Sequence, residues 1–320
     1  DKSFISIATG AKQSTSRAPA VATVITAEDI AATGARNVDE ALQAVPGMHV
    51  SVGYIYDPVY AVRGVHTKYN PQVLMLLNGV PLTNPYLGSR GDGWSTIPAE
   101  NIARIEVIRG PGSALYGADA FTGVINVITK TSSDIDGTLA GARVGSYNNR
   151  EGWIQHGGKR GPFQLAASLH VGKTDGPDET IATDTQSSLD QLFGTSASYA
   201  PGPVQRASDM IDGAIDLAYD KWRLRANYAQ RYHAQLGQGV ADALDKLGSF
   251  NVRRFLTDLN YHDADFAKDW EVSAQASYYE RGATTTVYPF PPGAFGGAYP
   301  DGMIGTPGRT ERTQRLNASG

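Results

Sequence analysis

The spacing of apolar and polar residues divides this chain into two parts. In residues 1–133, short apolar runs are separated by segments rich in Gly, Asn and Pro, which predicts strands joined by tight turns in a compact α/β domain. From about residue 137, apolar and polar residues alternate, which predicts strands that have one apolar and one polar face. We therefore expect a mixed domain followed by an extended β structure.

The first part begins with a predicted strand over residues 21–26. Thr26 is a suitable N-cap for a following helix, and Asp29 stands where a capping box requires its partner. Asn37 and Glu40 repeat this arrangement before a second helix. One face of that helix carries the apolar residues Val38, Ala41, Leu42 and Val45. Further strands are predicted in HVSV (49–52), VYAVRG (59–64), VLMLLNGVPL (73–82), IARIEVIRG (102–110) and GVINVITK (123–130).

In the second part, the alternation is clearest in four segments, which cover residues 163–171, 211–219, 222–228 and 270–278. Strands of about 9–11 residues have the length that crosses a bilayer when tilted. The connectors also alternate: they are tight at 159–162 and 220–221, and long at 174–208, 232–251 and 282–311. Short turns on one side and long loops on the other are typical of an outer-membrane barrel.

Aromatic residues near the predicted strand ends suit the interfacial girdles of such a barrel: Trp153, Tyr219, Trp222, Trp270 and Tyr278. We count about seven complete strands and the start of an eighth at 311–319. An eight-stranded barrel is filled by its own side chains and could not enclose the first domain. We therefore expect part of a larger barrel, cut within a strand. The alternative for amphipathic strands is a soluble β-sandwich.

Composition excludes several other classes. Lys and Arg number 28 against 32 Asp and Glu, so there is no basic excess for nucleic acid. The absence of Cys excludes disulfide scaffolds, thiolate zinc sites and cysteine catalysis. No apolar run predicts a transmembrane helix or a signal peptide, so we expect a chain that lacks a leader or is in its mature form. No nucleophile–base set is visible, and we predict that the protein is not an enzyme and carries no cofactor.

The glycine-rich stretch at 105–130 resembles a phosphate-binding loop at first sight. However, Gly110, Gly112 and Gly117 do not have dinucleotide-motif spacing, and Ala118 stands where a P-loop requires Lys. Pro111 also removes one of the N–H groups that a phosphate cradle needs. We therefore interpret this stretch as a turn between two strands, the second of which leads into the alternating region.

The order and spacing of several segments resemble the plug domain of TonB-dependent outer-membrane receptors. These segments are VATVITAEDI, VDEALQAVPGMHV, VYAVRG, VLMLLNGVPL and IPAENIARIEVIRGPGSALYGADAFTGVINVITK. The resemblance covers about residues 4–131, and the alternating strands begin where that family starts its barrel, usually of 22 strands. It implies an α/β plug domain followed by an antiparallel transmembrane β-barrel, of which the first seven to eight strands lie in this chain. The implied divisions are a TonB-box region and tether (1–12), the plug (13–135) and the N-terminal portion of the barrel (136–320).

The resemblance also implies a function. Members of this family lie in the outer membrane of Gram-negative bacteria and import scarce bulky nutrients, and the expected cargo here is a ferric siderophore or a cobalamin-like ligand. The implied partners are TonB with ExbB–ExbD, a small-molecule or metal-chelate ligand and outer-membrane lipid, but no nucleic acid. Two alternatives remain open, a passive porin-like channel and a soluble β-sandwich binding or adhesion module.

Individual residues receive roles from the same resemblance. The TonB-coupling segment would be Ser3, Phe4, Ile5, Ser6, Ile7, Ala8 and Thr9, which could add a strand to the sheet edge of TonB. The alternative is an ordinary N-terminal strand of the plug. Arg63 and Arg109 would latch the plug to glutamates of the barrel wall, and Glu106 would join them. The alternative is that each arginine caps a strand on the plug surface.

Ligand should meet the plug at the outward loops 53–60, 66–72 and 84–94. Their candidate residues offer aromatic faces and polar donors: Tyr54, Tyr56, Tyr60, His66, Tyr69, Asn70, Tyr86, Arg90 and Trp94. The alternative is that half of them pack beneath barrel loops. We predict no metal site, although the acidic loop 174–208 is a weak calcium candidate through Asp175, Asp178, Glu179 and Asp184. The aromatic and Pro/Gly-rich loop 282–311 is interpreted as a structured extracellular lid or binding loop.

Overall fold

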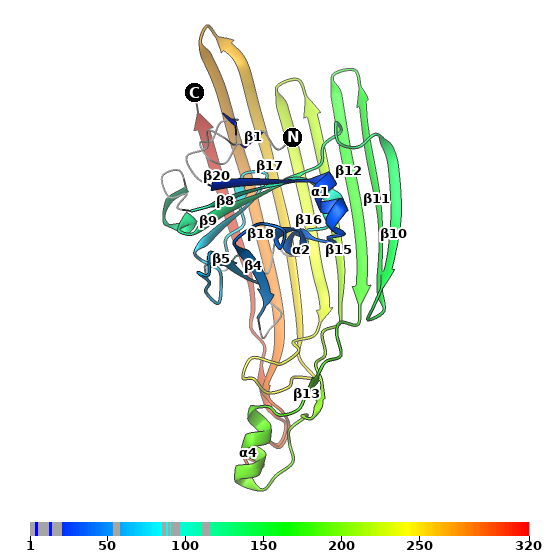
Figure 1. The fold of residues 1–320 in the computed structure, drawn as a ribbon, viewed down its shortest axis with the longest axis vertical. Coiled ribbons are helices and arrows are strands. Elements are labelled where there is room, and N and C mark those ends of the chain that lie inside the picture. Colours follow the sequence, from blue (N-terminus) through cyan, green and yellow to red (C-terminus); the bar gives the residue numbers. More distant parts are fainter. Residues whose placement is uncertain are drawn as a thin grey trace.

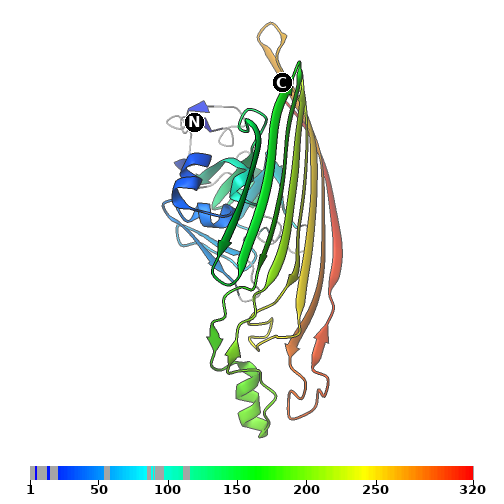
Figure 2. The same ribbon diagram turned by 90° about the vertical axis from the view of Figure 1, so that its right-hand side faces the viewer.

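The computed structural model describes residues 4–5, 13–14, 21–53, 58–84, 88, 90, 97–110 and 116–319. A domain of small sheets and short helices lies against one face of a large, curved antiparallel sheet (Figures 1 and 2). Among the described residues, no helix combines the length and the apolar character that a membrane crossing requires.

The N-terminal domain is built around a five-stranded sheet in the order β3-β8-β9-β6-β7. These strands are β3 (Val21–Thr26), β8 (Ile102–Arg109), β9 (Gly123–Thr129), β6 (Val73–Leu77) and β7 (Val80–Pro81). The strands β6 and β9 pair in parallel, and the other pairs are antiparallel. The remaining elements are β1 (Phe4–Ile5), β2 (Gln13–Ser14), α1 (Ala27–Thr33), α2 (Val38–Leu42), β4 (Met48–Val52), β5 (Pro58–Val62), η2 (Ala99–Asn101) and η3 (Gly117–Ala120).

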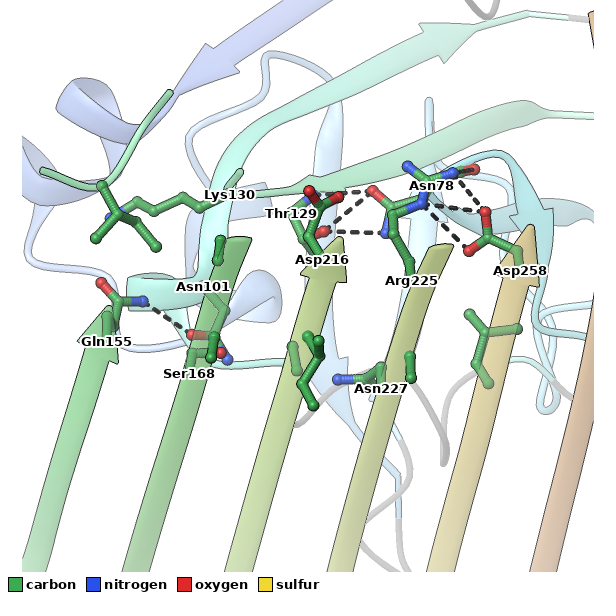
Figure 3. Close-up of a pocket in the computed structure, with 17 residues that line it drawn as sticks. Asn78, Asn101, Thr129, Lys130, Gln155, Ser168, Asp216, Arg225, Asn227 and Asp258 are labelled. Carbon is green, nitrogen blue, oxygen red and sulfur yellow. Dashed lines mark hydrogen bonds and ion pairs between the residues drawn. The ribbon is translucent and has the colours of Figure 1, made fainter. Parts of the chain in front are cut away.

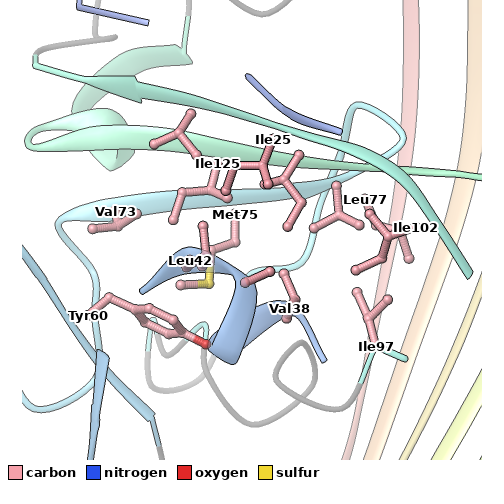
Figure 4. Close-up of a cluster of buried hydrophobic side chains, with 14 of the residues drawn as sticks. Ile25, Val38, Leu42, Tyr60, Val73, Met75, Leu77, Ile97, Ile102 and Ile125 are labelled. Carbon is pink, nitrogen blue, oxygen red and sulfur yellow. The ribbon is translucent and has the colours of Figure 1, made fainter. Parts of the chain in front are cut away.

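The predicted start signals of both helices are confirmed. Thr26 caps α1 and forms a full capping box with Asp29, and Asn37 caps α2 by accepting from the backbone N–H of Glu40. The helices close one face of the sheet over a fully apolar core (Figure 4). Its members include Ile25, Val38, Leu42, Tyr60, Met75, Leu77, Ile105 and Ile125. Most of this core is therefore supplied by the domain itself.

The large sheet contains eight long strands, each paired antiparallel with its neighbour in chain order. They are β10 (Gly137–Gly145), β11 (Asn149–Arg160), β12 (Phe163–Thr174), β15 (Ser208–Tyr219), β16 (Trp222–Ala234), β17 (Ser249–Ala267), β18 (Trp270–Phe290) and β20 (Gly308–Ser319). A short strand, β19 (Met303–Gly305), pairs with the end of β18. In the described chain β10 and β20 form the two edges and do not pair with each other. The sheet is therefore an open part of a barrel wall, as expected.

The strands are longer than the 9–11 residues predicted. β17 has 19 residues and β18 has 21, and the predicted loop 282–311 contracts because residues 282–290 belong to β18 and 308–311 to β20. For β18 the prediction followed the apolar alternation, which ends at Tyr278. Backbone pairing continues past that point because a ladder of hydrogen bonds does not require apolar side chains.

The two faces of the large sheet differ in the way that the alternation predicts. Apolar residues on the outer face are exposed, among them Leu165, Leu169, Ile215, Leu217, Leu224 and Leu259. Polar residues at the intervening positions are buried toward the N-terminal domain, among them Gln155, His170, Asp212, Asp216, Arg254 and Asp258. A soluble sandwich would bury the apolar face against a second sheet, so this alternative does not describe the fold.

One aromatic girdle is present at the short-turn end. Phe163 lies 4.6 Å from Tyr219, and Trp222 lies 4.9 Å from Tyr261, measured between ring centroids. The predicted placement in a girdle is wrong for two residues. Trp153 points inward, where it stacks on His170, and Tyr278 faces outward in the middle of β18 rather than at its end. Sequence position alone cannot tell which strand face carries an aromatic residue until the register is known.

The turns and loops separate to opposite ends of the sheet, as predicted. The turns after β11, β15 and β17 span two residues each, whereas the loop after β12 contains β13 (Thr180–Ile181), α4 (Thr185–Phe193) and β14 (Gly202–Pro203). Figure 1 shows α4 at the end opposite the short turns. The long loops contact one another: Leu244 N–H donates to Asp184, and the rings of Phe193 and Phe295 are 6.5 Å apart. They form one folded cap.

Candidate functional site

The N-terminal domain meets the large sheet along a line of polar contacts, which we call the seam (Figure 3). Its members are Asn78, Glu100 and Asn101 from the domain, and Gln155, Asp212 and Arg225 from the sheet. The domain residues come from two turns, and the sheet residues project from the inner face of β11, β15 and β16. The seam therefore joins segments more than fifty residues apart in sequence.

The first turn is η2, which follows Pro98 and ends at Asn101. The Asn101 side chain is buried, donates to Asp212 Oδ1 at 2.9 Å and accepts from Gln155 Nε2 at 2.9 Å. Gln155 Nε2 also donates to the carbonyl oxygen of Glu100 at 2.7 Å. The Glu100 carboxylate in turn pairs with Arg143 of β10 at 2.5 Å. One short turn thus binds three strands of the sheet, β10, β11 and β15.

The second turn joins β6 to β7 through Asn78-Gly79. Both residues have positive φ, 52° and 82°, as the two-residue turn of type I′ requires. The carbonyl oxygen of Asn78 accepts from Arg225 and from Gln275, each at 3.4 Å. The Asn78 side chain is held by Thr129 at 3.0 Å. The turn conformation therefore presents a carbonyl oxygen to the sheet while the side chain ties the turn to β9.

Charged residues support the seam from the sheet side. Arg225 forms a two-pronged ion pair with Asp258, with distances of 2.6 and 3.1 Å. The buried guanidinium of Arg254 lies 3.6 Å from Asp212. Each buried charge therefore has an opposite partner nearby, as burial in a low-dielectric interior requires.

Apolar contact across the seam is limited in the described residues. Leu256 and Tyr279 of the sheet join the apolar core of the N-terminal domain, whereas the contacts around them are hydrogen bonds and ion pairs. A single hydrogen bond adds only about 1 kcal/mol net, because water replaces it on separation. The seam thus positions the domain through directional contacts, each of which contributes little by itself.

The predicted latch arginines lie together on the N-terminal domain. Arg109 donates to the carbonyl oxygen of Pro46 and, at 2.9 Å, to Thr23 Oγ1, while the backbone N–H of Arg63 donates to Gly47 O at 2.8 Å. Both side chains approach Gly47, where a Cβ would stand 3.8 Å from Arg109 and 3.9 Å from Arg63. Among the described residues neither arginine forms an ion pair with the sheet. Pairing with wall glutamates therefore stays a prediction.

Glu106, the third predicted latch residue, lies inside the N-terminal domain. Its side chain is fully buried and pairs with Arg104 of the same strand at 3.0 Å. The two side chains project from the same face of β8, because residues two apart share a face. This contact lies within the N-terminal domain, so a role for Glu106 in a latch to the wall rests on the resemblance alone.

Three predicted ligand residues are instead structural. Tyr60 is fully buried and its hydroxyl donates to Asp39. The Asn70 amide binds Tyr60 N and the carbonyl oxygen of Pro58. Arg90 is 2% exposed, pairs with Asp119 at 2.9 Å and donates to the carbonyl oxygens of Pro71, Val73 and Asp119. Their polar groups are used inside the domain, so we remove these three from the candidate ligand surface.

Two predicted ligand residues keep accessible positions. His66 is exposed and Tyr69 is half-buried, and Lys68 lies 5.5 Å from the Tyr69 ring. The remaining four, Tyr54, Tyr56, Tyr86 and Trp94, lie outside the described residues. His66 and Tyr69 are therefore the candidates that the structure leaves at the surface of the domain.

The predicted TonB-coupling segment is described only at Phe4–Ile5. These residues form β1, which pairs antiparallel with Gln13–Ser14 in a sheet separate from the domain's main sheet. The positions 3 and 6–9 lie outside the described residues. Figure 1 shows β1 on the side of the domain nearer the short turns.

The acidic loop does not assemble a metal site in the described part of the chain, where no group of three His, Cys, Asp or Glu residues converges. Asp184 instead caps α4 and accepts from Ser187, Ser198 and Leu244. Glu179 lies at 4.0 Å from Arg206, and Asp175 accepts from Asn148. The calcium candidate is therefore wrong for this arrangement, because its carboxylates bind different partners.

Sequence reasoning missed the seam. The Asn-Gly turn and the segment around Glu100 were visible as turn signals, and Asp212 was visible as a polar position in an alternating strand. However, a turn residue and a strand residue can be matched only when the register and the placement of the domain are known. The signal that could have indicated the seam is the row of polar residues on the face of each amphipathic strand that lies opposite its apolar face.

Comparison with known proteins agrees with this architecture. A family model described as the TonB-dependent Receptor Plug Domain matches residues 14–124. The vitamin B12 transporter BtuB of Vibrio vulnificus is 38% identical over 131 residues, 40% of this chain and 21% of that protein. The iron-regulated outer membrane virulence protein of Vibrio cholerae is 36% identical over 189 residues, 56% of this chain and 28% of that protein. The chain thus matches only part of the length of these relatives.

Solved structures show the same fold at low identity. The pyoverdine outer membrane receptor FpvA from Pseudomonas aeruginosa matches with a TM-score of 0.66 and 17% identity, over 99% of this chain and 46% of that chain. The ferric yersiniabactin uptake receptor FyuA from Yersinia pestis matches with a TM-score of 0.56 and 16% identity, over 85% of this chain and 42% of that chain. The N-terminal domain therefore corresponds to a plug and the large sheet to part of a barrel wall.

Proposed function

We propose that this chain, which belongs to the TonB-dependent receptors of the outer membrane, supplies the plug and the first wall strands of an energy-coupled nutrient transporter. The cargo that we propose is a ferric siderophore or a cobalamin-like ligand. Of the proteins named above, one is a vitamin B12 transporter, one is an iron-regulated outer membrane protein, and two are receptors for pyoverdine and ferric yersiniabactin. We propose the same class of cargo for the whole receptor.

The observation that supports this proposal most is the combination of a core built mainly from the domain's own residues with a polar seam. A domain with its own apolar core can keep its fold when its contacts with the wall are broken. A seam of hydrogen bonds and ion pairs gives a defined resting position without a large apolar surface to separate. This combination suits a plug that blocks the lumen until force is applied.

The energy source that we propose is TonB with ExbB–ExbD. Among the described residues, the Phe4–Ile5 strand pairs with Gln13–Ser14, and such a short pairing can be exchanged for a strand of TonB. Its location on the short-turn side corresponds to the periplasm, because short turns face the periplasm in outer-membrane barrels. TonB could therefore reach this segment from the inner-membrane side.

For the ligand surface, we propose His66 and Tyr69 together with the predicted loops 53–60, without Tyr60, and 84–94, without Arg90. The hairpin of β4 and β5 extends toward the long-loop end in Figure 1. That end faces the outside of the cell, so ligand arriving there meets this part of the plug first. An exposed imidazole and an aromatic ring suit a bulky organic chelate.

The proposal is tested by deleting residues 3–9 in the whole receptor. We expect binding of the ligand to be unchanged and energy-dependent uptake to be abolished, because the plug would still fold but could not be pulled. Uptake is measured with radiolabelled ferric chelates or cobalamin in cells, and binding by quenching of tryptophan fluorescence in the purified receptor. A deletion mutant that retains uptake would contradict TonB coupling through this segment.

The porin-like alternative predicts a different electrical behaviour. If the plug occludes the lumen, the intact receptor in a planar bilayer should show almost no steady conductance. A receptor from which residues 1–135 are deleted should conduct strongly, because the lumen is then open. A large steady conductance of the intact receptor would favour the passive channel.

A further inference from the structure

One charged side chain of the seam stands between two carboxylates. Arg225 of β16 is directly opposite Asp216 of β15 on one side and directly opposite Asp258 of β17 on the other. Figure 3 shows the Arg225 side chain between the two aspartates on the inner face of the sheet. Residues opposite each other on antiparallel strands have Cβ atoms about 4.5–5.5 Å apart. The long arginine side chain can therefore reach either carboxylate without a change in the backbone.

The two carboxylates have different partners in this structure. Asp258 accepts from Arg225 at 2.6 and 3.1 Å and from Gln275 at 3.3 Å. Asp216 is also buried, yet neither of its oxygens accepts a hydrogen bond from a described residue. Its ion pair with Arg223 has a distance of 3.5 Å. A buried carboxylate without hydrogen bonds is unfavourable, so Asp216 is an open acceptor beside an arginine that is bound elsewhere.

The plug accounts for the side on which Arg225 is bound. The carbonyl oxygen of Asn78 accepts from Arg225 and from Gln275, each at 3.4 Å, and both of these donors also bind Asp258. The plug turn thus holds the two donors at the Asp258 carboxylate. A polar cavity beside this contact is lined by Asn78, Asp216, Arg225 and Asp258 among others (Figure 3). It gives the guanidinium space to move toward β15.

We propose that Arg225 is a two-position residue, bound to Asp258 while the plug is docked and shared with Asp216 once the Asn78 carbonyl has left. The plug turn favours the first position, because a binding partner shifts a population toward the state that it binds better. By the same linkage, Asp258 strengthens docking of the plug, whereas Asp216 competes for Arg225 and weakens docking. Arg225 is thus a positioning residue that sets how readily the seam opens. This inference rests on the proposed function in requiring that the plug leaves the wall.

Arg223 provides a matched control on the same strand. It lies two residues before Arg225 and therefore shares its face of β16. It is the cation that pairs with Asp216 in this structure. However, the register places it opposite Ala218 and Asn260, so it does not stand between two carboxylates. Its substitution alters the surroundings of Asp216 without removing the residue that changes position.

The test measures opening of the seam in the whole receptor in detergent, by hydrogen exchange of segments 73–82 and 97–105 with detection by mass spectrometry. Asp258→Asn should raise the opening equilibrium constant about tenfold, because the docked position loses its charged partner. Asp216→Asn should lower it about threefold, because the competing partner in the hydrated, open state is lost. Asp216→Ala should act in the same direction. Exchange of the wall strands reports whether each variant is folded.

Opposite effects of the two aspartates could also arise if Asp216 were merely costly to cover with the plug. The Asp216 substitution is therefore repeated in two backgrounds. In Arg225→Gln its effect on the opening constant should disappear, since no arginine is left to change position. In Arg223→Gln the effect should persist. A burial cost alone would persist in both backgrounds.

Three results would overturn the proposal. One is an unchanged or raised opening constant in Asp216→Asn while the wall strands exchange normally. Another is an Asp216→Asn effect that survives in the Arg225→Gln background, which would show a burial cost alone. The third is an effect that is lost in the Arg223→Gln background, which would assign Asp216 to Arg223. These measurements use neither cargo nor TonB, so their failure is distinct from a failure of energy-coupled uptake.

Discussion

The plug and the large sheet use apolar residues in opposite ways. Leu77 of the plug is completely buried in the core, whereas Leu217 of the sheet is 43% exposed on the outer face. The plug follows the rule for water-soluble domains, and the sheet follows the rule for a wall that has lipid on one side. Two domains of one chain are thus adapted to different solvents.

This difference explains the chemistry of the seam. Because the sheet turns its apolar face to the membrane, it can present only its polar face to the plug. The plug must therefore be held by matched polar groups such as Asn101 and Asp212, rather than by a continuous apolar surface. The polar seam agrees with the proposal of a movable plug, and four tests examine the comparison between the two parts.

The largest effect is expected from matched substitutions in the two parts. Leu77→Ala should destabilise the plug by about 3 kcal/mol, because it leaves a cavity in a closed core. Leu217→Ala should cost about 1 kcal/mol or less, since lipid or detergent fills the space. Urea unfolding of the plug within the whole receptor measures both. Equal losses would contradict the proposed difference between the two parts.

A smaller effect is expected at the seam. Gln155→Ala removes the donor to Glu100 O and Asn101 Oδ1 and should destabilise plug docking by about 1.5 kcal/mol, because buried acceptors lose their partner. The matched control is Gln314→Ala, which removes an exposed amide from the outer face of β20 and should be nearly neutral.

The seam can also be tested for coupling between its members. Asn101→Ala and Gln155→Ala remove the two ends of one contact, so the double variant should lose less than the sum of the single losses. The docking free energy is obtained from the same urea titrations. Strict additivity would show that the two side chains stabilise the plug independently, and the seam would then not be one unit.

The smallest effect concerns pH. Burial, with a contribution from Glu40, raises the pKa of Asp39 to about 7, although the Tyr60 hydroxyl and Arg231 oppose the shift. A carboxyl whose pKa is raised on folding favours the protonated state. Its contribution to stability is therefore complete below pH 3.8 and is lost as the pH rises through about 7.

Asp39→Asn should accordingly reduce the pH dependence of the free energy of unfolding of the plug between about pH 4 and 7. It should also make the plug more stable than the wild type near pH 8. Asp136→Asn, at an exposed carboxylate, serves as the control and should leave the profile unchanged. The measurement is the urea midpoint of the plug as a function of pH. A variant profile as steep as that of the wild type would contradict this role of Asp39.

Much of the fold was predictable from local signals. The strand at Val21–Thr26 and the capping box of Thr26 and Asp29 depend on residues close in sequence, and both are confirmed. The alternation of the later strands predicted which residues face outward, because a strand has a fixed period of two. The lengths of β17 and β18 were underestimated because backbone pairing extends beyond the apolar positions.

The candidate site was less predictable. Tyr60 and Arg90 have the chemistry of ligand residues, yet both are buried by distant segments, and Arg90 binds carbonyl oxygens at Pro71, Val73 and Asp119. Composition and spacing report what a side chain can do, but not which partners surround it. The two accessible candidates, His66 and Tyr69, could be separated from these only by their exposure.

The sequence by itself determined the division into a plug and a wall, the outward apolar face of the strands and the asymmetry of turns and loops, since each follows from periodicity or local turn chemistry. Only the tertiary structure decided that Asn78, Glu100 and Asn101 meet Gln155, Asp212 and Arg225. The physical reason is register. Strand pairing brings together residues from distant positions in the chain, and no local pattern specifies which of them will be opposite.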